Sequence, residues 1–212
     1  MTMRRKWQAI PGFLALAAAA TVVSAYSGAS SSQYRSPEQP VHFPHPRHAG
    51  AVNLKDPSHS GLGMNCLYCH YASNKSPDAG MPAVGTCMGC HTVVLGKADS
   101  SKKQIAKLTS YWNKRLPVPW VRIHKVPDYV NFPHMRHVNA GVTCQTCHGK
   151  IQGQWQVQQA ASLNMGWCIN CHVNGYRPGE GARLAGAPDS VIQAADKLPV
   201  HKARYDCSSC HY

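Results

Sequence analysis

The sequence has 212 residues, of which 22 are Lys or Arg and nine are Asp or Glu, so the formal net charge is +13 at pH 7. On composition alone this charge suggests nucleic acid or an anionic membrane surface as a partner, but the sequence contains no RNA- or DNA-binding motif, which argues against nucleic acid. Only 8% of the residues are aromatic, whereas 17 are Gly and 15 are Pro. We therefore expect short helices joined by long irregular segments.

The N-terminal segment has the pattern of a chain exported across a membrane. Basic residues 4–6 precede residues 7–34, which include no charged residue. About 20 residues of apolar chain can just span a bilayer, and basic flanks stay on the cytoplasmic side. We expect residues 1–29 to form a membrane anchor, with the rest of the chain on the periplasmic side of the cytoplasmic membrane after a tether over residues 30–40. Because the small residues 23–25 resemble a cleavage site, a removed signal peptide is the alternative.

Five Cys-x-x-Cys-His motifs contain all ten cysteines. The pattern is typical of covalent haem c attachment, in which the cysteines form thioethers and the histidine is the proximal iron ligand. A zinc ribbon does not require the histidine, and a thioredoxin-like pair needs one motif only; we therefore predict five haems c. The cysteines are Cys66 and Cys69, Cys87 and Cys90, Cys144 and Cys147, Cys168 and Cys171, and Cys207 and Cys210, followed by the proximal ligands His70, His91, His148, His172 and His211.

The haem count also predicts the kind of fold. Five haems leave about 35 residues for each one, which is too little apolar chain for a separate core around each cofactor. We expect a mainly α, loop-rich, haem-packed multihaem cytochrome c domain over residues 41–212. It contains two two-haem repeats, residues 41–95 and 130–175, and a fifth haem in residues 200–212.

The sequence Phe-Pro-His-x-Arg-His occurs twice, at residues 43–48 and 132–137, each time upstream of haem motifs. Its two histidines cannot both approach one iron face, so we predict that each unit bridges two haems. The alternative is that these histidines are surface residues. We assign His42 and His59 to the surface because they lack a counterpart, and we leave the role of His201 open. Met165, if it is not a packing residue, would give one haem a His/Met pair of higher potential; Met81 is a weaker candidate. The predicted distal ligands are His45, His48, His124, His134 and His137, with Met165 as the alternative.

The local geometry of these segments can also be predicted. Pro133 can start a helical turn at His134, whereas Pro46 disfavours helical geometry in the first unit, where we expect a distorted turn. Residues 100–117 have one apolar stripe and predict a helix. The three prolines and β-branched residues of 117–132 predict extended chain.

The Phe-x-His-x-x-His arrangement is similar to that of class III multihaem cytochromes. The run at residues 111–149, with LNMGWCINCH at residues 163–172, closely resembles the pentahaem cytochrome subunit of alternative complex III. The resemblance covers most of residues 40–212 and departs at residues 173–206. It implies a membrane-bound, quinol-oxidising respiratory complex with iron-sulfur and polytopic membrane subunits. Electrons would leave to a monohaem cytochrome, a soluble carrier or a terminal oxidase.

Three functions remain open at this point. The first is an electron-transfer subunit that is not catalytic by itself, with every iron six-coordinate. The second is a multihaem reductase with one open iron; such enzymes commonly replace one proximal histidine with lysine, and all five motifs here end in histidine. The third is a membrane-anchored quinol dehydrogenase feeding a periplasmic reductase. Each ferric haem also contributes about −1, which lowers the net charge to about +8.

Overall fold

The computed structural model describes residues 15–21 and 32–211. Most regular structure is helical, and the longest helix, α5, has 15 residues. In the described part of the chain the only β pairings are two isolated bridges, Val130 with His211 and Tyr176 with His201. The elements are α2 (His45–His48), η1 (Pro57–His59), α3 (Cys66–Cys69), α4 (Val84–His91), α5 (Asp99–Asn113), α6 (His134–Asn139), α7 (Cys144–His148), η2 (Ile151–Gly153), α8 (Met165–Asn174), α9 (Pro178–Ala185), α10 (Asp189–Asp196) and η3 (Cys207–Ser209).

The predicted fold class, mainly α with extensive irregular loops, is confirmed for the described residues. Residues 15–21 are helical, but most of the predicted anchor, residues 1–14 and 22–29, lies outside the described residues. None of the helices described is both long and apolar enough to cross a bilayer. The membrane anchor therefore stays a prediction.

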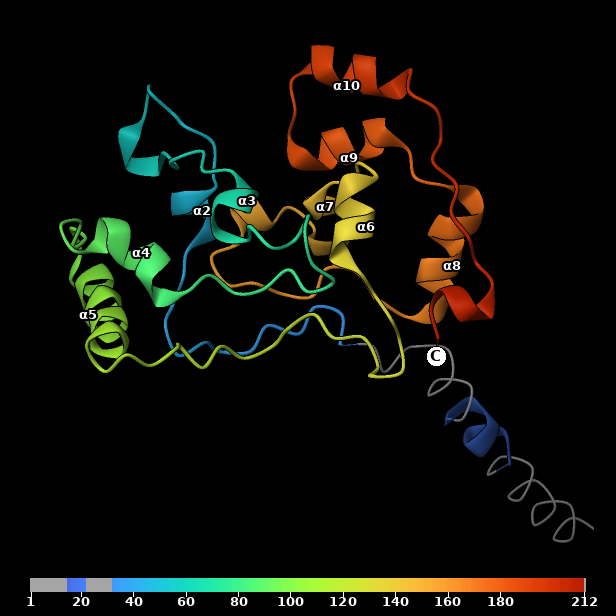
Figure 1. The fold of residues 1–212 in the computed structure, drawn as a ribbon, viewed down its shortest axis with the longest axis horizontal. Coiled ribbons are helices and arrows are strands. Elements are labelled where there is room, and N and C mark those ends of the chain that lie inside the picture. Colours follow the sequence, from blue (N-terminus) through green and yellow to red (C-terminus); the bar gives the residue numbers. More distant parts are fainter. Residues whose placement is uncertain (1–14, 22–31, 212) are drawn as a thin grey trace, which may run out of the picture.

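The helices follow one another along the long direction of the molecule (Figure 1). Helices α4 and α5 lie at one end, α2, α3, α6 and α7 lie in the middle with α9 and α10 beside α6 and α7, and α8 lies toward the other end. Helix α5 packs on α4, and helix α9 packs on both α7 and α10. This succession matters because four of the five Cys-x-x-Cys-His motifs lie on or at the end of α3, α4, α7 and α8, and the fifth lies on η3.

Long irregular segments run beside this row of helices. Gln39 exchanges two hydrogen bonds with the backbone of Val121, at 3.0 Å and 2.9 Å, so the chain before α2 lies beside the chain after α5 (Figure 1). Tyr34 donates its N–H to Gln159, whose side chain is the most buried in the described chain. The prediction of a helix within residues 100–117 is confirmed by α5, and residues 117–127 contain no helix or strand, as the prolines predict.

The expectation of a distorted first Phe-Pro-His turn was wrong. Residues His45–His48 form a turn of α-helix, with Pro44 as N-cap. Pro46 is tolerated because it lies in the first helical turn, where its missing N–H would have no intrahelical partner. In the second unit α6 begins at His134 after Pro133, as predicted.

The two predicted repeats are interlocked in the structure. The backbone hydrogen bonds to α2 come from its own repeat, since Leu62 and Met64 donate their N–H groups to Arg47 and His48, although α2 also packs on η2 of the second repeat. Gly61 allows the chain to run back against the segment after α2, because a Cβ at this position would meet the backbone of Gly50. Helix α6, by contrast, is held by the other repeat.

The bonds that hold α6 come from the loop after the first motif. The backbone N–H groups of His134 and Met135 donate to Pro77 and Ser76, and the Asn139 side chain donates to Asn74. The histidine pair of the second repeat is therefore positioned by residues of the first. The sequence alone does not indicate that residues of the first repeat hold α6 of the second.

Candidate haem sites

Four of the five Cys-x-x-Cys-His motifs adopt α-helical turns and the fifth adopts a 3₁₀ turn. Side chains three residues apart lie on one face of such a turn, so both thiols of each α-helical motif face the same side. The turn of α3 is capped by Asn65 and that of α8 by Asn164, each of which accepts a backbone N–H at 2.8 Å. This geometry suits attachment of one planar group through two neighbouring sulfurs.

Three proximal histidines share one hydrogen-bonding pattern. Nδ1 of His70 lies 3.1 Å from the carbonyl oxygen of Gly80, and that of His91 lies 2.8 Å from that of Val94. His172 makes the same contact with Arg204. A carbonyl can only accept, so Nδ1 carries the hydrogen and Nε2 is left as the metal-binding nitrogen. Histidines that bind metals typically donate their other ring N–H in this way.

Two pairs of histidine rings have the separation of opposite axial ligands. The ring centroids of His48 and His91 are 6.1 Å apart, and so are those of His137 and His172. A metal–imidazole bond of about 2 Å on each side of one ion puts two ring centres about 6 Å apart. The second histidine of each Phe-Pro-His-x-Arg-His unit thus lies opposite the proximal histidine of the second motif of its own repeat.

The two units have nearly the same internal geometry. Phe43 stacks on His48 with centroids 4.4 Å apart and 24° between the rings, and Phe132 stacks on His137 at 4.4 Å and 27°. Nδ1 of His48 donates to the carbonyl of Pro44, and Nδ1 of His137 donates to that of Pro133, each at 3.0 Å. The phenylalanine therefore fixes the ring plane, a role that sequence analysis missed although the residue is repeated in both units.

The first histidine of each unit lies in the middle of the molecule. Burial, followed by the nearby rings of His70 and His48, lowers the pKa of His45 to about 4. Its buried Nδ1 has no hydrogen-bond partner among the described residues, and such atoms normally have one. His134 donates Nδ1 to Pro77 at 2.9 Å, which leaves its Nε2 free. Burial thus holds His45 as the neutral imidazole that binds a metal ion, and the contact with Pro77 leaves Nε2 of His134 available for the same purpose.

His124 is not placed as the other predicted distal ligands are. Its Nε2 lies 3.2 Å from Nδ1 of His148, with ring centroids 4.2 Å apart and 72° between the rings. That separation leaves no room for an iron between the two rings. Burial, and then the neighbouring ring of His124, lowers the pKa of His148 to about 3. His124 therefore contacts the side of the proximal ring that faces away from Nε2.

The effects of neighbouring thiols on one another's pKa indicate the order of the five motifs along the molecule. Burial raises the pKa of Cys87, and nearby Cys69 adds to this effect. A hydrogen bond with Cys144 lowers the pKa of Cys66 to about 6. Burial raises the pKa of Cys147 to about 12, with Cys171 as the next cause.

The chain of contacts ends at the C-terminal motif, because burial and then nearby Cys210 raise the pKa of Cys168. The neighbours are thus the second and first motifs, the first and third, the third and fourth, and the fourth and fifth. This spatial order, second, first, third, fourth, fifth, agrees with the succession of α4, α3, α7, α8 and η3 in Figure 1. The sequence order of the first two motifs is reversed in space.

The fifth motif is held by the chain just before the second Phe-Pro-His unit. Asn131 donates its N–H to Cys210, Val130 bridges to His211, and the Tyr129 ring lies 5.7 Å from that of His211. Met165 is 61% exposed and lies one helical turn before Cys168, the cysteine whose thiol is close to Cys210. Met165 therefore lies on the face of α8 that carries Cys168, next to the fifth motif.

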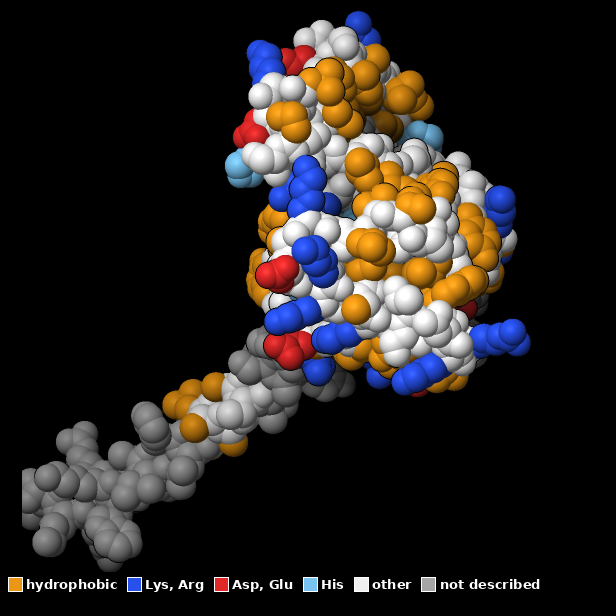
Figure 2. Space-filling view, turned by 90° about the vertical axis from the view of Figure 1, so that its left-hand side faces the viewer, with side chains coloured by type: hydrophobic (Ala, Val, Ile, Leu, Met, Phe, Trp, Pro, Cys, Tyr) orange, Lys and Arg blue, Asp and Glu red, His pale blue; other side chains and the backbone are white. Residues whose placement is uncertain are grey.

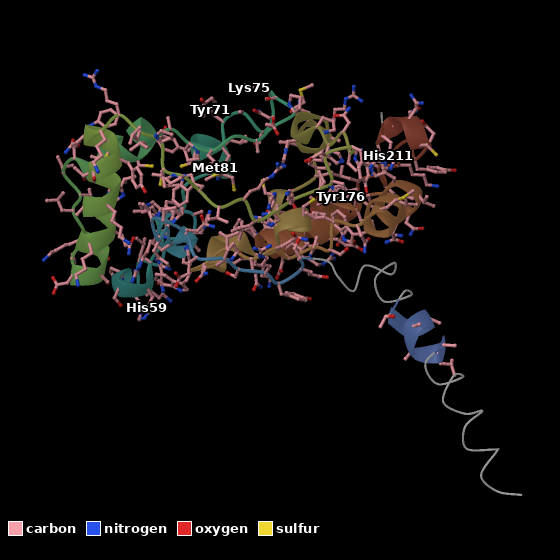
Figure 3. The ribbon with its side chains drawn as sticks, turned by 90° about the horizontal axis from the view of Figure 1, so that it is seen from below. His59, Tyr71, Lys75, Met81, Tyr176 and His211 are labelled. Carbon is pink, nitrogen blue, oxygen red and sulfur yellow. The ribbon has the colours of Figure 1, made fainter. Side chains whose placement is uncertain are left out.

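The remaining candidates do not lie in such pairs. His42 is exposed, and His59 contacts Asp56 at 2.6 Å on the surface. Figure 3 places His59 toward the α5 end and His211 toward the opposite end. The His201 backbone pairs with Tyr176 while its side chain is exposed. Met81 follows the glycine that accepts from His70 Nδ1, so it lies on the side of that ring away from Nε2.

The protein core is too small to hold the described chain together by itself. Seven hydrophobic side chains are buried among the described residues, and their one core cluster, Val41, Met88, Leu108 and Val118, lies where α5 packs on α4. Around α3, α7 and α8 the described residues form no such cluster. Large apolar groups attached to the five motifs would fill this space, which fits c-type haem at the histidine pairs described above.

Comparisons with known proteins agree with this fit. Residues 136–212 match the family model of cytochrome c3. The chain is also 31% identical, over 115 residues, to the menaquinone reductase multihaem cytochrome c subunit of Nitratidesulfovibrio vulgaris strain Hildenborough. Both comparisons support a multihaem c-type cytochrome. They also support covalently bound c-type haems as its cofactors and electron transfer as its general role.

The likeness to the relative is partial. It covers 54% of this chain and 48% of the relative, so the chain spans about half the length of the protein it matches. The family match covers the second repeat from Arg136, together with the fifth motif. The first repeat, with motifs at Cys66 and Cys87, lies outside it.

Proposed function

We propose that this cytochrome is the electron-relaying subunit of a membrane-bound, quinol-oxidising respiratory complex of the alternative complex III kind, and that it carries five haems c. The observation that supports this most strongly is the linear order of the five motifs, because a row of neighbouring sites connects two ends of a molecule. The resemblance of residues 111–149 and 163–172 supports the choice of complex.

The side chains have distinct tasks in this proposal. Haem c, once attached, supplies a one-electron ferric–ferrous couple at each site. The ten cysteines hold the groups covalently, and the proximal histidines donate through Nε2 while carbonyls such as those of Gly80 and Val94 fix their rings. The predicted distal residues, four histidines and Met165, would fill the remaining positions, which would exclude external ligands and substrate chemistry.

We assign the distal ligands within each repeat. His48 would bind the iron opposite His91, and His137 would bind the iron opposite His172, because the ring centroids of each pair are 6.1 Å apart. Because the units have the same geometry, we assign their first histidines to the first motifs: His45 would pair with His70, whose ring is the largest cause of its lowered pKa after burial, and His134 would pair with His148. Met165 would be the distal iron ligand at the fifth motif, next to which it lies. Each unit then bridges two neighbouring sites.

The partners in this proposal are the iron-sulfur and polytopic membrane subunits of the complex, and a monohaem cytochrome, soluble carrier or terminal oxidase as acceptor. A second candidate runs in the opposite direction, since the curated relative is named as a subunit of a menaquinone reductase. In that case electrons would enter from a carrier and leave to the quinone. The row of sites serves either direction equally well.

The intact complex, purified from its native source, tests the proposal. We expect five haem additions on the denatured chain by mass spectrometry, and reduction of its haems by added menaquinol or ubiquinol. All haems should stay low spin in the presence of carbon monoxide, because every iron is closed. Haems that are oxidised by quinone but not reduced by quinol would favour the reductase direction, and one high-spin, ligand-binding haem would favour a multihaem reductase.

We also propose that the haem domain lies on the periplasmic side of the cytoplasmic membrane, held by residues 1–29. The uncharged stretch after the basic residues 4–6 supports this. Sequencing the N-terminus of the mature protein should find the anchor still present. A mature chain that begins at Tyr26 would instead identify the segment as a removed signal peptide.

A further inference from the structure

The end of the molecule that carries the second motif differs in charge from the opposite end. Residues 97–115 contain six basic residues and one acidic residue. All six basic side chains are exposed, and the acidic residue, Asp99, lies 3.5 Å from Lys102. The basic residues are Lys97, Lys102, Lys103, Lys107, Lys114 and Arg115.

At the other end the charges are balanced. Residues 177–206 contain five basic and four acidic residues. Three of the basic side chains lie within 4.0 Å of a carboxylate, in the pairs Arg177–Glu180, Arg183–Asp196 and Arg204–Asp206. Residues 97–115 therefore carry a larger net positive charge than residues 177–206.

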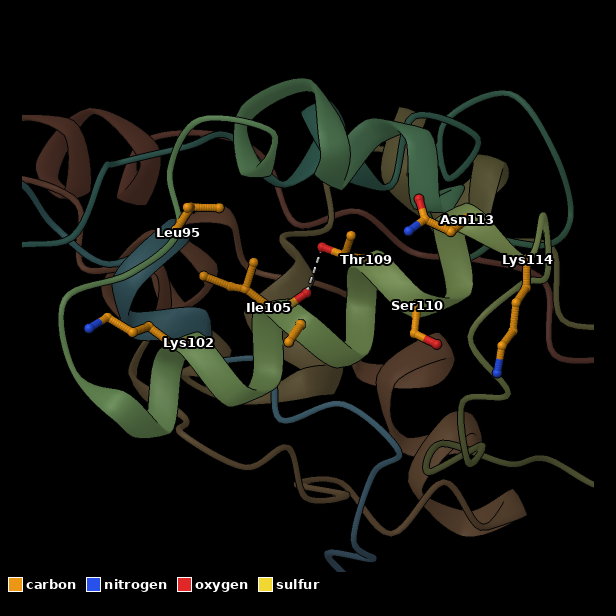
Figure 4. Close-up of a pocket in the computed structure, with 8 residues that line it drawn as sticks. Leu95, Lys102, Ile105, Thr109, Ser110, Asn113 and Lys114 are labelled. Carbon is orange, nitrogen blue, oxygen red and sulfur yellow. Dashed lines mark hydrogen bonds between the residues drawn. The ribbon is translucent and has the colours of Figure 1, made fainter.

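The α5 surface also has an apolar part. A shallow groove of about 700 Å³ runs along α5, with Leu95 and Ile105 in it and Lys102 and Lys114 at its two ends (Figure 4). Val93 and Leu95 are 80% and 58% exposed. Figure 2, which faces this end of the molecule, shows Lys and Arg side chains around apolar ones, with few acidic groups. An apolar centre with a charged rim is typical of protein docking surfaces.

This surface is directly connected to the outermost motif. The exposed segment begins two residues after His91, and the carbonyl of Val94 accepts the hydrogen bond from His91 Nδ1. On its other side α5 packs against α4 through Leu108 and Met88. A partner seated on the α5 surface would thus lie beside the second motif, where the row of sites ends.

We propose that residues 93–97 and the exposed face of α5 form the docking site for an electron-transfer protein with an acidic surface. One electron passes there between the carrier's redox centre and the haem at the second motif, so one partner is oxidised and the other reduced. Charge complementarity steers the encounter, and the apolar groove supplies short-range contact. This inference rests on the proposed electron-transfer function.

The test uses the haem-loaded full chain and reduced plant-type [2Fe–2S] ferredoxin, an acidic one-electron carrier. The site variant is Lys103→Glu/Lys107→Glu/Lys114→Glu, whose residues lie on one side of the solvent face of α5. The control, Arg177→Glu/Lys197→Glu/Lys202→Glu, makes the same change in net charge at the other end. We expect the site variant to lower the second-order rate constant of haem reduction at least tenfold at low salt, and the control to lower it less than threefold.

Binding provides an independent readout. The dissociation constant for oxidised ferredoxin, measured by calorimetry at low salt, should rise in the site variant and stay near the wild-type value in the control. Equal losses in the two variants, or none in the site variant, would overturn the proposal. So would loss of binding to phosphatidylserine vesicles with an unchanged ferredoxin rate, since the surface would then bind membrane. Failure of quinol to reduce the intact complex would reject the proposed function without altering this comparison.

Discussion

Replacement of His137 by alanine should convert one haem from low spin to high spin while every haem stays attached. The His137 ring lies 6.1 Å from that of His172, the separation of two ligands on one iron. Attachment depends on the cysteines and not on the sixth ligand, so the mass of the chain should fall by the side-chain difference alone. Electron paramagnetic resonance should show the new high-spin signal, and carbon monoxide should now bind to the reduced protein.

Three comparisons make this prediction specific. His48→Ala should give the same change at the second motif, because the two units have the same ring geometry. His59→Ala should leave all spectra unchanged, since that side chain is 80% exposed and contacts only its surface neighbours Asp56 and Ser58 among the described residues. Added imidazole should restore the low-spin signal of the His137 variant. If His137→Ala kept all haems low spin with unchanged potentials, the second histidine of the unit would be a structural residue and our account of the duplication would fail.

Much of this site could be predicted from sequence because its chemistry is local. Cys-x-x-Cys-His fixes the attachment residues within one helical turn, and duplication of Phe-Pro-His-x-Arg-His marks His48 and His137 without any structure. Helix α5 follows from its apolar stripe and Pro117. The mistake at Pro46 was also local: the residue was judged as a helix breaker, although in the first turn of α2 its missing N–H carries no penalty.

What could not be predicted depends on contacts between distant segments. No pattern in residues 74–77 indicates that their carbonyls hold α6, and nothing at Gly80 or Arg204 indicates that their carbonyls orient His70 and His172. Carbonyl oxygens occur at every residue and leave no trace in composition. The reversed spatial order of the first two motifs has the same origin, since it depends on how whole repeats interlock.

His124 is the predicted distal ligand for which we infer a different role. Sequence analysis placed it among the distal ligands, whereas its Nε2 lies 3.2 Å from Nδ1 of His148. If His148 binds iron through Nε2, its Nδ1–H donates to His124. Such a bond makes the proximal ligand more basic and favours the ferric state. His124 would then set a potential without touching the iron.

Replacement of His124 by alanine should accordingly raise the midpoint potential of one haem and leave every haem low spin. Loss of one hydrogen bond worth about 1.4 kcal/mol shifts the oxidised-to-reduced ratio about tenfold, which is about 59 mV for a one-electron couple. His124→Gln, whose amide oxygen can still accept from His148, should keep most of the wild-type potential. Spectroelectrochemical titration of the two variants measures both effects. A high-spin haem in His124→Ala would show that His124 is a distal ligand. An unchanged potential would show that the contact with His148 does not affect the haem.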